Sequence, residues 1–151
     1  MPGTASELVA QAKQWASNYG EFPNGEEGAV LTVPLRIRGA WERNDADLFA
    51  DVFADEGAML VGDTQLTSPQ EVREYLRTAF AGAYKGARLE EEPVVIRKLS
   101  DNVAFAVTKG GLILEGETEV APERQVRTTW VIIKENGDWK LFNHQTSPIS
   151  G

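Results

Sequence analysis

The chain has 151 residues, 42% of them hydrophobic and 25% charged, which is typical of one soluble globular domain. Its 15 Lys and Arg against 23 Asp and Glu give a formal net charge of −8, which argues against binding to nucleic acid or to an anionic membrane. There is no cysteine and one histidine, so a disulfide framework, a thiolate metal site and a cysteine nucleophile are excluded.

We expect no metal and no other cofactor. One histidine cannot supply the usual two or three ligands of a metal site, and no strand–GxGxxG–helix fingerprint for a dinucleotide is present. The acidic runs, residues 26–27 and 90–92, are interpreted as solvated surface.

The same patterns predict where the protein resides and how it is organised. No apolar run approaches the ~20 residues of a transmembrane helix, and the first residues lack the basic and apolar regions of a signal peptide. We therefore expect a cytoplasmic protein with a single domain over residues 1–151. Residues 1–25 would form an extra helix and loop in front of a core at residues 26–149.

The N-terminal part of the chain predicts helices. Residues 4–20 begin with Thr4 and Glu7, the two polar positions of a capping box. A second helix is expected at residues 27–43, where Pro34 predicts either a kink or a later start.

A short third helix should follow, capped by Asn44 or Asp45 and with Phe53 facing inward. Residues 56–62 then predict a strand. The next helix has the strongest signal, because Ser68 and Glu71 form a capping box around a proline at the first helical position.

From Arg88 onward the hydrophobic period changes from 3.6 to 2, which indicates strands. The Asn136-Gly137 pair predicts a tight hairpin between the last two. Helices followed by a long antiparallel meander predict an α+β fold. We expect a cone, in which a strongly twisted antiparallel sheet carries the helices on one face; the resemblance described below implies that the curved sheet is mixed and mainly antiparallel, with the helices on its concave face. The four strands are expected at residues 88–98, 102–114, 124–134 and 138–146.

The alternation of side chains along the last strand indicates which of its residues could face an internal site. If Trp139 faces inward, Asn143 and Gln145 share its face near the wide end of the cone, and His144 lies outside. A β-bulge between Phe142 and His144 would reverse this arrangement, so the facing of His144 stays open. Two amides on an inner face favour a polar pocket, although they can also simply end a strand.

Large aromatic side chains are expected at inward positions. Trp41, Tyr75 and Trp130 would either fill the core or line a ligand cavity, and the amide pair nearby favours the cavity. The strand at residues 124–134 is apolar on both faces around Trp130. This pattern predicts that a second copy of the chain covers the outer face of the sheet.

Several stretches together carry a resemblance to a known family. They are AVLTVPLRIRGAW, FADVFADEGAML, AFAGAYKGARL, GGLILEGETEVAPERQVRTTW and WKLFNHQTSPI. Over residues 28–149 the chain resembles the SgcJ/EcaC-type, SnoaL-like branch of the nuclear transport factor 2-like (cystatin-like) superfamily. Within that branch it is most similar to the SgcJ proteins of enediyne antibiotic gene clusters.

The resemblance implies a cone that is often dimeric through its outer sheet face. It also implies a partnership with an enediyne polyketide synthase and action on a linear polyene intermediate. Steroid isomerases of the superfamily use a tyrosine and an aspartate at positions that correspond here to Ile37 and Val61. Their proton abstraction therefore does not carry over, and Asp63 is the alternative acid. Relatives often have an aromatic residue before a glutamine where this chain has His144 and Gln145.

The expected function is a cofactor-free pocket that takes a conjugated apolar intermediate and either cyclises it, isomerises it or chaperones that step. Whether the protein is an enzyme stays open, and the alternative is a non-catalytic scaffold of the synthase. We expect Gln145 to matter more than His144. The candidate catalytic residues are His144, Gln145 and Asp63, and the candidate substrate-binding residues are Ile37, Trp41, Phe53, Tyr75, Trp130 and Asn143.

Overall fold

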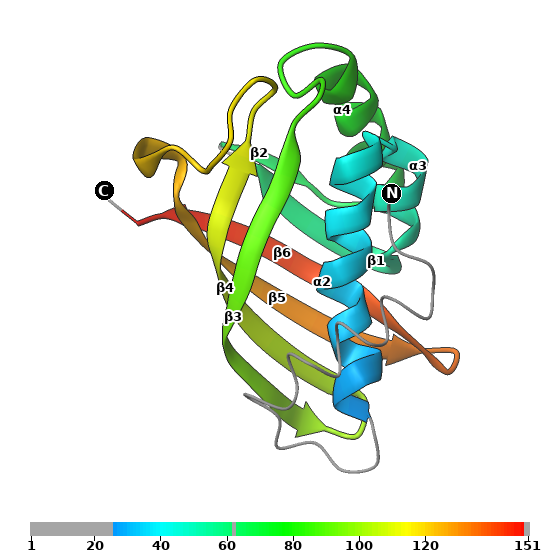
Figure 1. Cartoon of the computed structure of the whole chain (residues 1–151). Coiled ribbons are helices and arrows are strands. Elements are labelled where there is room, and N and C mark those ends of the chain that lie inside the picture. The colour runs from blue at the N-terminus through cyan, green and yellow to red at the C-terminus, as the bar shows by residue number, and fades with distance from the viewer. Residues whose placement is uncertain (1–25, 62, 150–151) are drawn as a thin grey trace.

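The computed structural model describes residues 26–61 and 63–149 (Figure 1). The helix expected at residues 4–20 lies outside these ranges. None of the described helices is long and apolar enough to cross a membrane. The described α-helices are α2 (Glu26–Arg43), α3 (Ala46–Asp51) and α4 (Pro69–Ala81), and a single 3₁₀ turn, η1 (Pro122–Arg124), precedes the fifth strand.

Six strands form one sheet in the order β2-β1-β6-β5-β4-β3. Strand β1 runs parallel to β6, and every other neighbouring pair is antiparallel. The predicted α+β class with a mixed, mainly antiparallel sheet is therefore confirmed. The strands are β1 (Phe53–Val61), β2 (Thr64–Leu66), β3 (Arg88–Ser100), β4 (Val103–Ile113), β5 (Val126–Glu135) and β6 (Asp138–Pro148).

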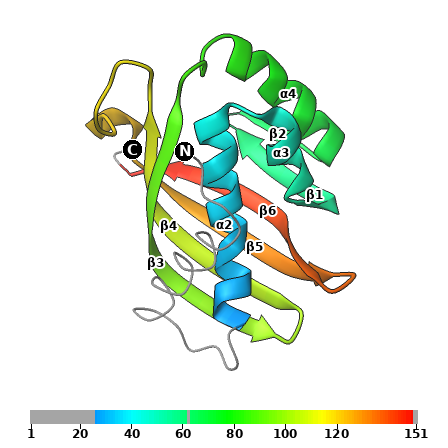
Figure 2. The ribbon, with the colours of Figure 1, turned by 45° about the vertical axis from the view of Figure 1, so that its right-hand side comes forward.

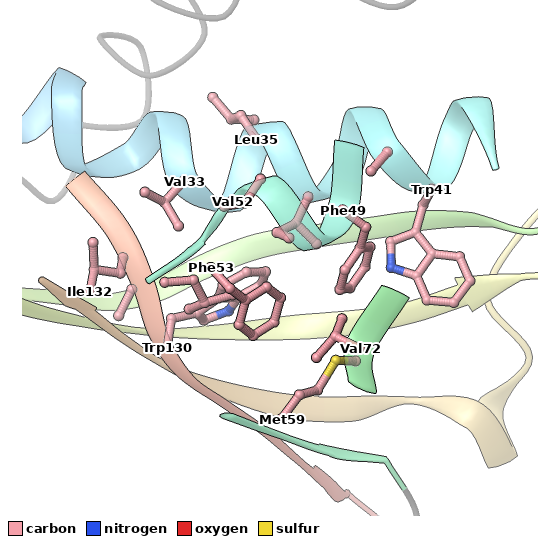
Figure 3. Close-up of a cluster of buried hydrophobic side chains, with 14 of the residues drawn as sticks. Val33, Leu35, Trp41, Phe49, Val52, Phe53, Met59, Val72, Trp130 and Ile132 are labelled. Atoms are coloured by element: carbon pink, nitrogen blue, oxygen red, sulfur yellow. The ribbon is translucent and has the colours of Figure 1, made fainter. Parts of the chain in front are cut away.

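The sheet curves around α2, which lies across its concave face (Figures 1 and 2). Helices α3 and α4 contact each other and lie at one end of the cone, beside β1. Buried side chains from α2, α3, α4 and the inner sheet face form one core (Figure 3). Residues of α4, of the C-terminal part of α2 and of the ends of β4 and β6 lie at the same end of the molecule, where they border one cavity.

Local sequence signals account for most element ends. The Ser68 side chain accepts a hydrogen bond from the Glu71 backbone N–H at 3.2 Å, as predicted for the start of α4. Asp45 is the cap of α3, with its carboxylate accepting from the Leu48 N–H at 3.0 Å. Asn136 and Gly137 both have positive φ, 53° and 85°, which fits the expected two-residue hairpin turn.

The helix expected at residues 27–43 is confirmed as α2, and of the two alternatives for Pro34 the later start is excluded, because α2 runs from Glu26 through the proline. One helix prediction needed correction. Helix α3 ends at Asp51, and Phe53 already belongs to β1, although its side chain is buried as expected. The short strand β2, Thr64–Leu66, was not predicted, because three residues after a turn carry too little pattern to recognise.

Gly110 allows β3 and β4 to approach each other closely where they form one wall of the cone. A Cβ at this position would lie 2.0 Å from the Glu90 carbonyl oxygen and 2.7 Å from the Glu91 Cα. Any other side chain would therefore push β3 away from β4. This approach matters for function because Glu91, the partner of Gly110 in the ladder, lines the site described next.

Candidate functional site

A cavity of about 250 Å³ lies between the inner sheet face and helices α2 and α4. Most of its wall is apolar, and residues from five strands, from α2, α4 and η1, and from the turn after α4 contribute to it. This size is just below the ~300–1,000 Å³ of a typical drug-sized site, so the occupant is small or only partly enclosed. The wall residues are Trp41, Met59, Leu60, Val61, Tyr75, Leu76, Tyr84, Leu89, Glu91, Gly111, Leu112, Arg124, Val126, Thr128, His144 and Thr146.

A β-bulge in β6 decides which side chains reach this cavity. Leu141 pairs with Ile132 and Asn143 with Val131, so Phe142 is one extra residue in the ladder. The parity of β6 therefore changes at Phe142, and His144 turns inward. The expectation that Gln145 faces inward is wrong, because its side chain is exposed. The bulge alternative is the one observed.

His144 is buried on the cavity wall, with only 6% of its surface exposed. Its ring packs edge-on against the Trp130 indole, with ring centroids 4.6 Å apart and an interplanar angle of 88°. Its Nδ1 has no hydrogen-bond partner within residues 29–61 and 63–149. A buried polar atom of this kind costs free energy unless something else pairs with it.

Burial lowers the pKa of His144 from 6.5 to about 4, and the electrostatic effect of its own backbone only partly opposes this shift. The imidazole is therefore neutral near pH 7. A neutral imidazole offers one N–H donor and one lone pair, so it can donate to a carbonyl or accept from a hydroxyl.

A chain of hydrogen bonds runs from the core to the opposite wall of the cavity. The Trp130 Nε1–H donates to Thr108 Oγ1 at 2.9 Å, and the Thr108 hydroxyl donates to Glu91 Oε2 at 2.7 Å. Thr108 and Trp130 are both fully buried. The chain fixes the position of the Glu91 carboxyl on the wall.

Glu91 contradicts the interpretation of residues 90–92 as solvated surface. Glu90 and Glu92 are exposed as expected, but Glu91 is only half-exposed and its carboxyl reaches buried Thr108. Desolvation raises the pKa of Glu91, and hydrogen bonds from Thr108 and Thr128 oppose this shift only in part. The sequence did contain a signal, because Glu91 has the same strand parity as Leu89, which lines the cavity.

Trp41, Tyr75 and His144 are the predicted site residues that the structure brings together on the wall. Trp41 lies at the boundary between cavity and core, with its ring edge-on to those of Phe80 and Tyr84. Burial, and secondly the charge of nearby Tyr84, raise the pKa of Tyr75, so its hydroxyl stays protonated.

The remaining predicted site residues lie elsewhere. Ile37, Phe53 and Trp130 are part of the buried core instead of the wall. Figure 3 shows Phe53 and Trp130 there. Asp63 is exposed in the turn between β1 and β2, and Asn143 is half-buried on β6 away from the cavity wall. Gln145 also lies off the cavity wall, because the bulge in β6 turns its side chain to the exposed face.

One cationic residue lies among the described wall residues, and its charge is already paired. The Arg124 guanidinium forms an ion pair and hydrogen bond with the Glu117 carboxylate. The same carboxylate accepts from the Leu114 N–H at 2.9 Å, and the Arg124 hydrogen bond lowers the pKa of Glu117. No group of three or more acidic or histidine side chains within residues 26–61 and 63–149 is placed to hold a metal ion.

Comparison with solved structures shows the fold. A cystatin-like domain of unknown function from Nostoc punctiforme is 24% identical, with a TM-score of 0.76 over 83% of this chain and 78% of that chain. A nuclear transport factor 2-like protein from Shewanella oneidensis is 14% identical, with a TM-score of 0.65 over 79% and 96%. A ketosteroid isomerase-like protein from Erwinia carotovora atroseptica is 18% identical, with a TM-score of 0.61 over 82% and 95%.

These similarities show a nuclear transport factor 2-like, cystatin-like fold. Comparison with curated proteins finds no match. The sequence model of the SnoaL-like domain matches residues 30–150, which is most of the chain and includes every wall residue of the cavity. The chain therefore belongs to the SnoaL-like domain family.

Proposed function

We propose that the protein binds a small, uncharged, flat apolar molecule in this cavity and hydrogen-bonds one hydroxyl or carbonyl group of it through His144. The observation that carries the proposal is the buried imidazole, whose Nδ1 has no partner in the described part of the chain, on an otherwise largely apolar wall. A ligand oxygen on the cavity side of the ring would give the imidazole a hydrogen-bond partner. The rings of Trp41, Tyr75 and Tyr84 offer flat surface for the ligand body.

The charges around the cavity favour a neutral ligand. Arg124, the cation among the described wall residues, is already paired with Glu117. An anionic ligand would have to enter a largely apolar space beside Glu91 without a free cation to compensate its charge. We therefore expect carboxylates to bind far more weakly than alcohols or ketones of the same size.

The chemistry that suits this cavity is cofactor-free proton rearrangement, such as isomerisation or cyclisation of a conjugated molecule. An imidazole whose pKa is about 4 is a weak base near pH 7. Its proposed task is therefore to polarise a ligand oxygen by a hydrogen bond, as a neutral donor in a water-poor site. The ketosteroid isomerase-like neighbour shares the fold. The resemblance places Ile37 and Val61 where steroid isomerases have a tyrosine and an aspartate, so that chemistry does not carry over to this chain.

The finer assignment is a role in enediyne polyketide biosynthesis, with a linear polyene as the ligand and a polyketide synthase as the partner. It rests on the sequence resemblance over residues 28–149. Because the cavity holds only about 250 Å³, an extended polyene would enter with one part of its chain while the rest stayed outside. The alternative is a non-catalytic scaffold that docks on the synthase through its acidic surface, as the net charge of −8 suggests.

Calorimetric titration with 2-naphthol tests the proposed binding. This probe is flat, neutral at pH 7 and carries one hydroxyl. We expect it to bind the wild-type protein with one site per chain, and His144→Leu to weaken binding by about tenfold, the value of one hydrogen bond.

Gln145→Ala is the matched control, because Gln145 is the next residue on β6 and its side chain is exposed on the other face. It should bind 2-naphthol as the wild type does. Absence of binding to the wild type, or equal affinities of His144→Leu and wild type, would overturn the proposed function.

We also propose that two copies of the chain pair through the outer sheet face. Val94 and Phe142 are large apolar side chains with 46% and 38% exposure, and Phe105 and Val131 are half-buried neighbours on the outer face. Light scattering at micromolar concentration should give twice the 16.6 kDa mass of the chain. Val131→Glu should then give the single-chain mass, because it places a charge in the centre of the interface. A single-chain mass for the wild type would contradict the pairing.

A further inference from the structure

The geometry of β3 points to a second ligand contact. We infer that Glu91 is the other polar anchor of the cavity, so that the ligand is a neutral molecule with hydroxyl or carbonyl groups at both ends of a flat apolar body. This inference rests on the proposed function and specifies its ligand. Glu91 and His144 would each hold one end.

The first observation that supports this inference is the position of the two side chains. His144 lies on β6 and Glu91 on β3, and strands β5 and β4 separate them in the sheet. Both side chains line the same cavity, and Thr128 of β5 lines it between them. A ligand that lies across the inner sheet face would therefore meet His144 on one side and Glu91 on the other, with Thr128 between them.

The second observation is the direction of the hydrogen bonds that reach the Glu91 carboxyl. The Trp130 indole nitrogen can only donate, so Thr108 Oγ1 accepts its proton and must donate its own to Glu91 Oε2. Thr128 forms a further hydrogen bond that favours the ionised carboxyl, as a donating hydroxyl does. The two hydroxyls therefore hold the carboxyl in place as donors and do not accept the carboxyl proton.

The third observation is that Glu91 has no positively charged partner in the described part of the chain. Glu91 forms no ion pair within residues 29–61 and 63–149, and burial raises its pKa. Partial desolvation without a neighbouring cation favours the protonated form of a carboxyl relative to one in water. Such a group donates a hydrogen bond to a ligand oxygen and can exchange the proton with it, which complements the weakly basic imidazole on the other side.

The chain offers a matched set of variants for the test. Glu91→Leu removes the anchor and keeps the size, whereas Glu91→Gln replaces the acid by a neutral group that can still donate. Glu90→Leu is the control, because Glu90 is the exposed neighbour on the same strand. The probes are 2-naphthol, with one hydroxyl, and 2,6-dihydroxynaphthalene, with a hydroxyl at each end of the same ring system.

The ratio of the two dissociation constants is the readout. We expect the wild type, Glu90→Leu and Glu91→Gln to bind the diol about fivefold to tenfold more tightly than 2-naphthol, the effect of one additional hydrogen bond. Glu91→Leu should bind both probes equally. Retention of the diol preference in Glu91→Leu, or its loss in Glu91→Gln, would overturn the inference.

A second measurement needs no substitution at this site. In wild-type protein labelled with ¹³C, the side-chain carboxyl resonance of Glu91 should move on addition of the diol and stay unchanged with 2-naphthol. An unmoved resonance at saturating diol would overturn the inference. Failure of the proposed function would give a different result. In that case 2-naphthol would not bind the wild type, or it would bind wild type and His144→Leu with equal affinity.

Discussion

Trp130→Ala is expected to lower the free energy of unfolding by about 3–5 kcal/mol, the usual cost of truncating a core aromatic residue. The indole is fully buried, packs against His144 and donates a hydrogen bond to Thr108. Its removal leaves a void and also frees the Thr108 hydroxyl that holds Glu91. Urea unfolding followed by circular dichroism measures the change.

Trp130→Phe is the companion variant, because it keeps an aromatic ring in the core and removes the N–H donor. Its expected loss is smaller, about 1–2 kcal/mol, for one hydrogen bond and part of the packing. If Trp130→Ala lost less than about 1 kcal/mol, the indole would instead belong to a loosely packed cavity wall. The sequence left core and cavity wall open for Trp130 and favoured the cavity wall.

The second large effect is a dependence of stability on pH that arises from His144. Its pKa is about 4 in the folded protein and 6.5 as the reference for the unfolded chain. The folded state binds the proton less tightly, so the stability due to the neutral imidazole is present above pH 6.5 and is lost as the pH falls towards 4. Between pH 7 and pH 4 the loss should reach about 3 kcal/mol.

His144→Leu isolates this contribution, because leucine fills a similar volume and does not titrate. Glu91 acts in the opposite direction. Its raised pKa means that the folded state takes up its proton more readily, so the cost of its burial is relieved as the pH falls. Glu91 is present in both proteins, and the difference between their stability profiles therefore reports His144. Parallel profiles of the two proteins from pH 7 to pH 4 would contradict a buried neutral imidazole.

Much of the fold could be predicted because its signals are local. The capping box at Ser68, the change of period at Arg88 and the Asn136-Gly137 turn each determine an element end, and each is confirmed. The order of the strands and the parallel pairing of β1 with β6 are long-range properties that no local pattern encodes. The family resemblance implied only a curved, mixed sheet, so the strand order and this pairing were not predicted.

The candidate site was harder to predict because one inserted residue changed its composition. Alternation from Trp139 was correct up to Leu141, and the bulge at Phe142 then exchanged the two faces of β6. His144 therefore replaced Gln145 on the inner face. A bulge depends on the pairing with β5, so the sequence could name the possibility but could not decide it.

Glu91 was missed for a different reason. Its two exposed neighbours, Glu90 and Glu92, gave the segment the composition of a surface run. Only parity with Leu89 distinguished it, and burying a carboxyl is so unfavourable that parity alone is weak evidence. Its partners, Thr108 and Thr128, lie on other strands and are visible only in the folded structure.

The most direct test of the proposed site is the ¹⁵N spectrum of the imidazole side chain, since His144 is the only histidine of the chain and its signals need no assignment. The account predicts a neutral imidazole that does not titrate between pH 8 and pH 5, and a shift of one ring nitrogen when 2-naphthol is added. The exposed-face variant Gln145→Ala should behave in the same way. An imidazole that titrates near its ordinary pKa of 6.5, with resonances that do not respond to saturating 2-naphthol, would contradict it.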